Sequence, residues 1–401
     1  MHRTSVIGRL GCRGFSSTIH EVSPTAAIKD AAPIAITARA IRDLTLAETE
    51  QMLRAAGERP FRARQIMSWL WQRNAESFAA MTDLPVGLRE WLAANWALEA
   101  PDACVSEVVR SADGTRKLLI RAGGEAVESV IIPADERTTL CISSQAGCAM
   151  GCEFCATARM GLRRNLAASE ILGQILAARS CLAEGETLTN YVFMGMGEPL
   201  ANYQRLARAL TIMTEPWGMG ISPRRITVST VGLIPMMERL LAEFQVNLAV
   251  SLHATTDELR DRIAPINRRY PLGELIEACR GLPLARRRRI MFEYVMLDGV
   301  NDSDTEARRL ARMLGPLRAK VNLIFFNPFP GAPFAPSPRT RVEAFQAVLH
   351  RGNLTATIRE SRGRDIAAAC GQLYAEHQQG GSTVTVQKRW TEVTQRKRER
   401  N

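Results

Sequence analysis

Residues 147–155 read Gly-Cys-Ala-Met-Gly-Cys-Glu-Phe-Cys, which places Cys148, Cys152 and Cys155 in a Cys-x3-Cys-x2-Cys pattern. The pattern follows directly on an apolar run at 138–143 that we expect to be a strand. Three thiolates on one short loop can reach three corners of an iron–sulfur cluster, because thiolate is a soft ligand that suits iron. Zinc sites usually use two separated ligand pairs, and the sequence offers no second pair. We therefore expect a three-cysteine cluster whose remaining iron is open to a small molecule.

Apolar runs alternate with amphipathic segments on both sides of these cysteines. Helical periodicity covers, for example, 166–182 and 233–243. The strand-like runs lie at 138–143, 190–195, 225–230, 246–251, 290–297 and 320–326. Strands that alternate with helices build parallel βαβ units, so residues 137–376 predict an α/β fold with a closed or partial (βα)6 barrel. The chemistry of such folds lies in the loops that follow the strands.

Two small segments precede the predicted barrel. Residues 101–136 contain three strand-like runs and the turn signal Asp113-Gly114, which predict a β-hairpin extension. Residues 39–100 show helical periodicity and predict an N-terminal helical accessory domain that binds RNA. Its candidate basic face consists of Arg59, Arg62, Arg64 and Arg73.

The two ends of the chain are basic. Residues 1–38 contain several arginines and no acid before Glu21. We read them as a flexible basic arm, and an organellar transit peptide is the alternative interpretation of that composition. Residues 377–401 are rich in Lys and Arg and predict a basic disordered tail.

The composition is that of a soluble globular protein. The chain has 401 residues, of which 46% are hydrophobic and 23% charged. It has no uncharged apolar stretch of about 18 residues, which excludes a membrane-spanning helix. The formal net charge of +11 suits a polyanionic partner such as RNA. Arg286–Arg289, together with Arg268 and Arg269, predict positive charge around the barrel mouth, either for RNA phosphates or as a solvated face.

Polar residues and glycines recur where the predicted strands end. Gly197-Glu198-Pro199 follows the second barrel strand, where Gly lets a ligand approach the backbone and a carboxylate can accept from an ammonium group. Ser229, Ser251 and His253 end the third and fourth strands, and Asn327 precedes Pro328. Taken singly, each of these residues is equally explained by turn or capping chemistry.

The cysteine pattern, with Phe154 before its last cysteine, resembles the signature of radical S-adenosylmethionine (SAM) enzymes. The chain is further similar to the RlmN/Cfr family of RNA methyltransferases from about residue 61 to about residue 374. The motifs that carry this resemblance lie at 145–148, 193–200, 228–232, 251–254, 265–272, 327–331 and 364–373. The resemblance implies a partial (βα)6 radical SAM barrel, and one 4Fe-4S cluster on Cys148, Cys152 and Cys155. It also implies SAM, used twice per turnover, and methylation of carbon 2 of adenosine in 23S rRNA and in tRNA.

The resemblance also assigns individual residues. Cys370 lies among small residues and, taken alone, is either a buried inert thiol or a thiol with room for a ligand. The resemblance makes Cys370 the methyl carrier, and Cys141 the partner thiol that closes a disulfide with it and releases a transient protein–RNA adduct. Glu128 lies in an apolar strand whose alternation favours a surface position, whereas the resemblance makes it a proton acceptor. The SAM contacts that the resemblance implies are Gly197, Glu198, Ser229, Ser251, Leu252, His253 and Asn327.

Two alternatives remain open at this point. A relative of the same family could methylate carbon 8 of adenosine, and the residues do not separate the two positions. A non-enzymatic RNA-binding protein with a structural cluster would need a fourth protein ligand. For the enzyme we expect a cytoplasmic monomer, an electron donor such as flavodoxin, and no membrane partner.

Overall fold

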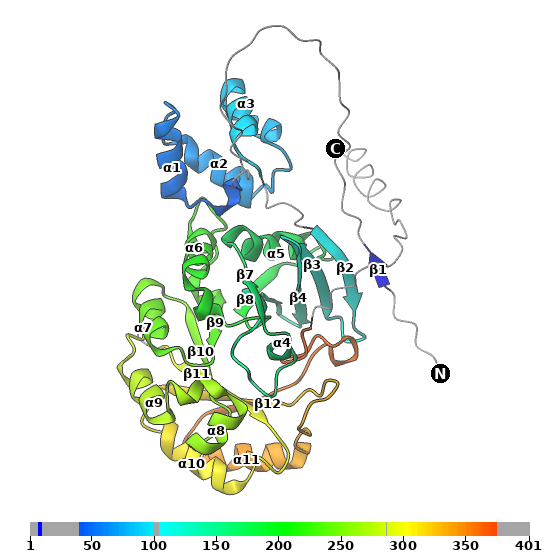
Figure 1. Cartoon of the computed structure of the whole chain (residues 1–401), viewed down its shortest axis with the longest axis vertical. Coiled ribbons are helices and arrows are strands. Elements are labelled where there is room, and N and C mark those ends of the chain that lie inside the picture. The colour runs from blue at the N-terminus through cyan, green and yellow to red at the C-terminus, as the bar shows by residue number, and fades with distance from the viewer. Residues whose placement is uncertain (1–6, 10–39, 99–103, 286, 375–401) are drawn as a thin grey trace, which may run out of the picture.

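The computed structural model describes residues 7–9, 40–98, 104–285 and 287–374. Its spine is one 11-stranded sheet in the order β1-β2-β3-β4-β5-β8-β9-β10-β11-β12-β13, with helices packed along the barrel part (Figure 1). No helix in the described part of the chain is both long enough and apolar enough to cross a membrane.

Seven parallel strands form the barrel part of the sheet. They are β5 (Arg137–Cys141), β8 (Leu188–Phe193), β9 (Ile226–Thr230), β10 (Asn247–Ser251), β11 (Ile290–Met296), β12 (Ala319–Phe325) and β13 (Ala356–Arg359). Among the described strands, β13 pairs only with β12, so the barrel is open. The predicted α/β fold with a partial barrel is therefore confirmed, with a seventh strand, β13, that the sequence did not predict.

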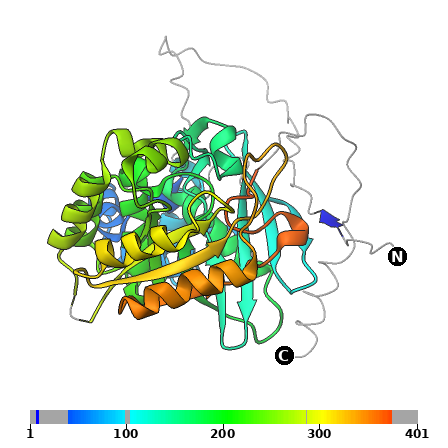
Figure 2. The same ribbon diagram turned by 90° about the horizontal axis from the view of Figure 1, so that it is seen from below.

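The helices between these strands cover the outside of the barrel, as the view at right angles shows (Figure 2). They are α5 (Ala168–Ser180), α6 (Tyr203–Thr214), α7 (Ile234–Glu243), α8 (Asp257–Ile263), α9 (Leu272–Gly281), α10 (Asp304–Leu314) and α11 (Arg339–Arg351). Short 3-10 helices lie at η1 (Ile41–Asp43), η2 (Phe78–Ala80), η3 (Pro199–Asn202), η4 (Pro223–Arg225), η5 (Pro265–Arg268) and η6 (Arg364–Ile366).

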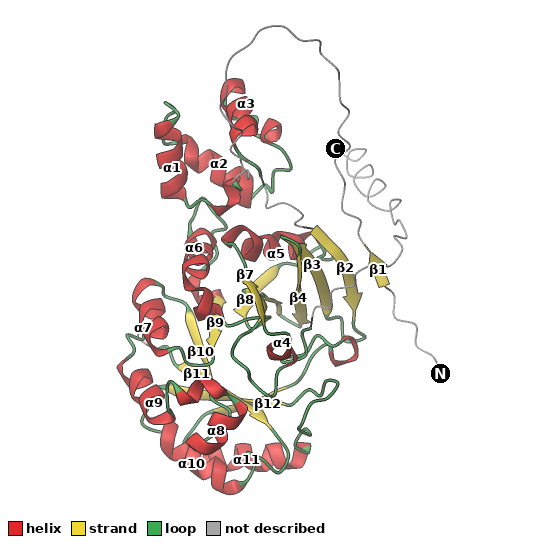
Figure 3. Ribbon diagram, in the orientation of Figure 1, coloured by secondary structure: helices red, strands yellow, loops and turns green. Residues whose placement is uncertain are grey.

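The segment before the barrel is a three-strand meander, with strands at the three strand-like runs of the sequence. Its strands are β2 (Cys104–Arg110), β3 (Arg116–Ala122) and β4 (Glu125–Ala134). Because β4 pairs antiparallel with β5, the meander continues the barrel sheet (Figure 3). Three residues of the basic arm form β1 (Ile7–Arg9), which pairs with β2. The rest of the arm and the predicted basic tail lie outside the described residues.

The N-terminal helices pack on the flank of the barrel. They are α1 (Leu46–Ala55), α2 (Arg62–Trp71) and α3 (Val86–Asn95). Thr45 and Glu48 form a reciprocal capping box that begins α1. Polar contacts join this unit to the barrel helices: Arg208 Nη2 lies 2.6 Å from Glu48 Oε1, and Arg179 Nη1 donates to the Trp71 carbonyl at 2.9 Å.

Candidate active site

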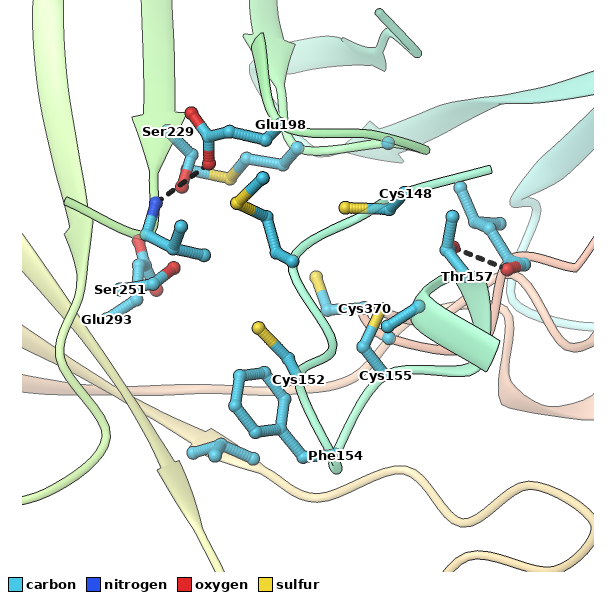
Figure 4. A pocket seen from close by; sticks show the side chains of 18 of the residues that line it. Cys148, Cys152, Phe154, Cys155, Thr157, Glu198, Ser229, Ser251, Glu293 and Cys370 are labelled. Atoms are coloured by element: carbon cyan, nitrogen blue, oxygen red, sulfur yellow. Dashed lines mark hydrogen bonds between the residues drawn. The ribbon is translucent and has the colours of Figure 1, made fainter. Parts of the chain in front are cut away.

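The three cysteines of the motif line one cavity at the carboxyl ends of the barrel strands, here called the cluster cavity. Its volume is about 160 Å³. Figure 4 shows the sulfur atoms of Cys148, Cys152, Cys155 and Cys370 facing the same central space. No three or more His, Cys, Asp or Glu side chains among the described residues are grouped so as to hold a single metal ion.

A tight hairpin holds the cysteine loop in place. Its strands are β6 (Gln145–Gly147) and β7 (Leu162–Asn165), and α4 (Ala156–Arg159) begins directly after Cys155. Gly147 has φ +74°, and a Cβ there would lie 1.9 Å from the Gly161 carbonyl oxygen. A side chain at Gly147 would therefore push the two hairpin strands apart.

Burial makes the motif cysteines poor thiolates unless a metal compensates their charge. It raises the pKa of Cys148 to about 12 and also raises the pKa values of Cys152 and Cys155. A bound metal ion deprotonates a coordinating thiol, so buried thiols that face one cavity suit iron ligation better than acid–base work. The donor set therefore fits a cluster.

A buried carboxylate faces the cluster cavity beside these cysteines. Glu198 is 3% exposed, and its oxygens accept from the backbone N–H groups of Leu200 at 3.0 Å and Val231 at 2.9 Å. Burial raises the pKa of Glu198 to about 7. Gly197, at φ +95°, leaves no room for a side chain, because a Cβ there would lie 2.5 Å from the Gln145 side chain. An ammonium group in the cavity would find its counter-charge in Glu198.

The other predicted SAM contacts do not all face this cavity. Ser229, Ser251 and His253 line it, at the carboxyl ends of β9 and β10. Leu252 is fully buried and does not line it. Asn327 is buried and donates from Nδ2 to the Cys370 carbonyl at 3.1 Å, so it contacts the Cys370 backbone.

The His253 side chain packs against the cysteine loop. Its ring meets Phe154 edge-on with centroids 4.4 Å apart, and its Nδ1 accepts from the Val295 N–H at 3.0 Å. Burial lowers the pKa of His253 to about 3, so the imidazole is neutral. With Nδ1 as the acceptor, the proton lies on Nε2.

A second, larger cavity opens toward the amino ends of the strands, and we call it the lower cavity. Its volume is about 660 Å³. Cys141 lines this cavity. The pKa of its thiol is raised to about 12, mainly by burial and to a smaller extent by the nearby Cys370. Cys370 lines both cavities, and both thiols are free. The geometry therefore places Cys370 at the junction between the two cavities.

Glu128 is buried, contrary to the surface position that strand alternation favoured. It is 4% exposed because β4 lies between β3 and β5 and is covered on both faces. Its Oε1 lies 2.8 Å from Lys117 Nζ, and its Oε2 accepts from the Tyr374 N–H at 2.8 Å. Glu128 lines neither cavity.

Two charged residues at the site were absent from the sequence prediction. Arg359, the last residue of β13, lines both cavities. Glu293 on β11 pairs in register with Ser251, lines the cluster cavity, and accepts from Asn322 Nδ2 at 3.1 Å. The signal for Glu293 was an acid inside an apolar strand, whereas Arg359 could be found only by recognising β13.

The arginine run lies at the opposite end of the barrel from the position we expected. Arg288 and Arg289 precede β11 and therefore sit at the amino ends of the parallel strands, whereas the cysteine loop follows the carboxyl end of β5. Arg289 lines the lower cavity. Arg286 lies outside the described residues. The expected position of Arg288 and Arg289 is therefore corrected to the rim of the lower cavity. Arg268 lies in η5, whose first residue Pro265 lies against Gly151 of the cysteine loop, so it stays at the cluster end.

Comparisons with known proteins agree with this architecture. Residues 142–311 match the model of the radical SAM superfamily, and residues 40–98 match that of the ribosomal RNA large subunit methyltransferase N-terminal domain. The "Dual-specificity RNA methyltransferase RlmN" of Anaeromyxobacter dehalogenans is 52% identical over 343 residues, which cover 84% of this chain and 92% of that protein. The chain belongs to the RlmN family of radical SAM RNA methyltransferases.

Other RlmN family members are similar over the same length. The RlmN of Syntrophus aciditrophicus is 48% identical over 334 residues, 83% of this chain and 95% of that protein. A crystal structure of a radical SAM methyltransferase from Sphaerobacter thermophilus superposes with a TM-score of 0.79 at 50% identity, covering 84% of this chain and all of that one. As a radical SAM enzyme, this RlmN family member uses a 4Fe-4S cluster and SAM. The alternative of a non-enzymatic RNA-binding protein is set aside.

Proposed function

We propose that this RNA methyltransferase methylates carbon 2 of adenosine in 23S rRNA and in tRNA, with Cys370 as the methyl carrier. The observation that carries the proposal is the position of Cys370 at the junction of the cluster cavity and the lower cavity. Carbon 2 of adenine is electron-poor, so direct polar transfer of a methyl group from SAM fails. A thiol that faces the cofactor on one side and the base on the other supports a relay.

The cluster cavity supplies the SAM side of this relay. Bound there, the cluster and SAM supply both the methyl group and the one-electron chemistry that activates it. Cys148, Cys152 and Cys155 hold the cluster, and Glu198 accepts from the SAM ammonium group. The remaining SAM contacts are Gly197, Ser229, Ser251, Leu252, His253 and Asn327. Of these, Asn327 acts through its hydrogen bond to the Cys370 carbonyl and Leu252 through its backbone, because their side chains do not line the cavity.

The lower cavity takes the target base. It is large enough for a nucleobase, and Arg137, Arg289 and Lys320 line it near the strand starts. A base must leave its stack to reach Cys370, which costs a few kcal/mol and favours looped RNA.

The two lone thiols and Glu128 then complete the transfer. The methyl carbon on Cys370 loses one hydrogen atom to the one-electron chemistry that SAM supplies, and it then joins carbon 2. The adduct gives up one electron, which the cluster would take back, and the proton on carbon 2, which Glu128 accepts. The Cys141 thiolate attacks the Cys370 sulfur, so an S–S bond forms and the S–C bond breaks. The electron pair of that bond stays with the carbon on adenine, which takes up a proton and becomes the methyl group.

The reaction implies further partners. Reduction of the cluster requires a one-electron donor, for which we propose a flavodoxin. Because we propose rRNA and tRNA as substrates, we also propose that the enzyme acts in the cytoplasm, and that it does so as a monomer.

Single-cysteine variants test the proposal directly. Cys141→Ala should start the reaction and then stall with the chain joined to its RNA, because no second thiol can form the disulfide. On a denaturing gel we expect a nuclease-sensitive slow band that the Cys141→Ala/Cys370→Ala variant lacks. Normal turnover by Cys370→Ala would overturn the proposal, and mass spectrometry of the product distinguishes carbon 2 from carbon 8.

A further inference from the structure

A largely buried ion pair contacts the segment that carries Cys370. Lys117 on β3 and Glu128 on β4 bring Nζ and Oε1 to 2.8 Å, and their side chains are 15% and 5% exposed. Neither side chain lines the cluster cavity or the lower cavity. A buried charge pair of this kind costs desolvation, so its retention calls for an explanation beyond stability.

The pair contacts both ends of the segment 367–374, here called the Cys370 loop. Lys117 Nζ donates to the Ala367 carbonyl at 3.4 Å, and the Tyr374 N–H donates to Glu128 Oε2 at 2.8 Å. One ion pair thus connects the residue three positions before Cys370 with the residue four positions after it.

On the same side, the meander also holds the residues just before the Cys370 loop, because the Gly363 N–H donates to Asp113 Oδ2 at 2.9 Å. The loop itself departs from regular secondary structure. Ala367 and Gly371 have φ values of +50° and +83°, and positions 367–369 are all alanine. The left-handed backbone at Ala367 is unfavourable for a residue with a Cβ and persists only where the surroundings enforce it. Lys117 Nζ donates to the carbonyl of Ala367 itself, so it contacts the residue whose backbone conformation needs support.

The opposite side of the loop is bound to the cysteine motif. The Ala156 N–H donates to the Gly371 carbonyl at 2.7 Å, and Thr157 Oγ1 donates to the Leu373 carbonyl at 2.6 Å. Both donors belong to α4, which follows Cys155 directly. The loop is therefore clamped between the cluster side and the meander.

We propose that Lys117 and Glu128 form a latch that holds the Cys370 loop with its thiol at the junction of the two cavities. Both are positioning residues for the methyl carrier, and this inference rests on the proposed function. The latch also engages the carboxylate that we assign as proton acceptor. Glu128 can face the target adenine only after its hydrogen bond with the Tyr374 N–H is broken. Movement of the Cys370 loop is thereby coupled to the release of Glu128 as a proton acceptor.

Methyl loading of Cys370 without RNA isolates the latch from the later chemistry. Holoenzyme is mixed anaerobically with SAM and without reductant, and S-methylation of the Cys370 peptide is followed by mass spectrometry. For Lys117→Met we expect loading to slow about tenfold, since misplacing a reacting group by about 1 Å can cost 100-fold. Hydrogen exchange at the Cys370 loop should become faster, and Lys117→Arg should restore both properties.

Matched variants separate the latch from a general loss of stability. Arg121→Met replaces an exposed cation of the same strand and should change neither readout. Lys117→Met/Glu128→Gln leaves no unpaired buried charge, so it should recover the thermal midpoint of the wild type while loading stays slow. Loading and exchange at wild-type values in Lys117→Met, or full recovery of loading in the double variant, would overturn the latch.

The same assays distinguish a failed latch from a failed function. If the wild type never loads a methyl group on Cys370, the proposed function falls. If the wild type loads and Lys117→Met loads equally well, the function stands and only the latch falls.

Discussion

Arg359 is a half-buried cation that lines both cavities, as Cys370 does, and it acts on both reactive thiols. Its Nη1 lies 3.6 Å from Met194 Sδ, and the Met194 backbone hydrogen-bonds to the Cys141 thiol. The charge of Cys370 is the largest influence that raises the pKa of Arg359, with Glu293 and Cys141 contributing. Arg359 in turn lowers the pKa of Cys141 against the larger effect of burial. Lys320 is a further cation, and its charge lowers the pKa of Glu293 against the larger effect of burial.

Replacing this cation should make Cys141 harder to ionise. In Arg359→Met the thiol pKa rises, so less thiolate exists at a given pH. We expect alkylation of Cys141 in RNA-free holoenzyme to slow about tenfold at constant pH, because an adjacent opposite charge typically shifts a pKa by about 1–3 units. Peptide mass spectrometry across a pH series measures the rate.

Two companion variants check that prediction. Arg359→Lys keeps the charge and should retain most of the alkylation rate. Arg289→Met removes a cation from the amino-end rim of the same cavity and should leave the pH profile of Cys141 unchanged. An unshifted profile in Arg359→Met would show that the charge does not govern this thiol.

The β6–β7 hairpin makes a prediction at the level of one element. Gly147→Ala should lower the iron content of reconstituted protein, because the new Cβ meets the Gly161 carbonyl at 1.9 Å and displaces the cysteine loop. Gly161→Ala is the matched control. It has a similar φ of +64° but nothing within 4 Å of the new Cβ, so it should cost about 1 kcal/mol of backbone strain and keep its iron. Equal iron in all three proteins would contradict the geometric argument.

The elements differ in how far the sequence predicts them. The six predicted barrel strands appear with bounds shifted by one or two residues, because each is an apolar run between helical patterns. β13 escaped prediction because its four residues, Ala-Thr-Ile-Arg, carry too little periodicity. Local pattern also misplaced Glu128, since alternation cannot tell an edge strand from one covered on both faces.

The same limit applies to the site. Residues of the cysteine motif and the strand ends could be proposed from sequence because they lie in recognisable local patterns. The Lys117–Glu128 pair joins strands β3 and β4 to a loop about 250 positions later in the chain, as the Lys117–Ala367 contact shows. Such a contact depends on the sheet order and has no local signal.

The distribution of charge over the whole molecule favours one end of the barrel for RNA. Several cations lie at the starts of the parallel strands and form no ion pair with an acid in the described part of the chain: Arg137, Arg224, Arg288, Arg289 and Lys320. Burial and the nearby Arg224 lower the pKa of Arg288, so two positive charges lie close together without a neutralising acid. By contrast, arginines on the outer helices, such as Arg280 with Glu277, are paired. Of this strand-start rim, Arg137, Arg289 and Lys320 line the lower cavity.

RNA affinity should therefore fall steeply with salt and depend on this rim. Each phosphate contact releases counterions, so removing two of them should reduce the slope of log K against log [salt] by about 1.4–1.8. We expect this change for Arg288→Ser/Arg289→Ser, measured by fluorescence anisotropy with a labelled RNA hairpin, while the iron content stays constant. Arg280→Ser, which removes an arginine already paired on α9, should leave the slope unchanged. If both variants keep the wild-type slope, the rim is a solvated face and RNA must approach from the cluster end, where Arg268 lies in η5.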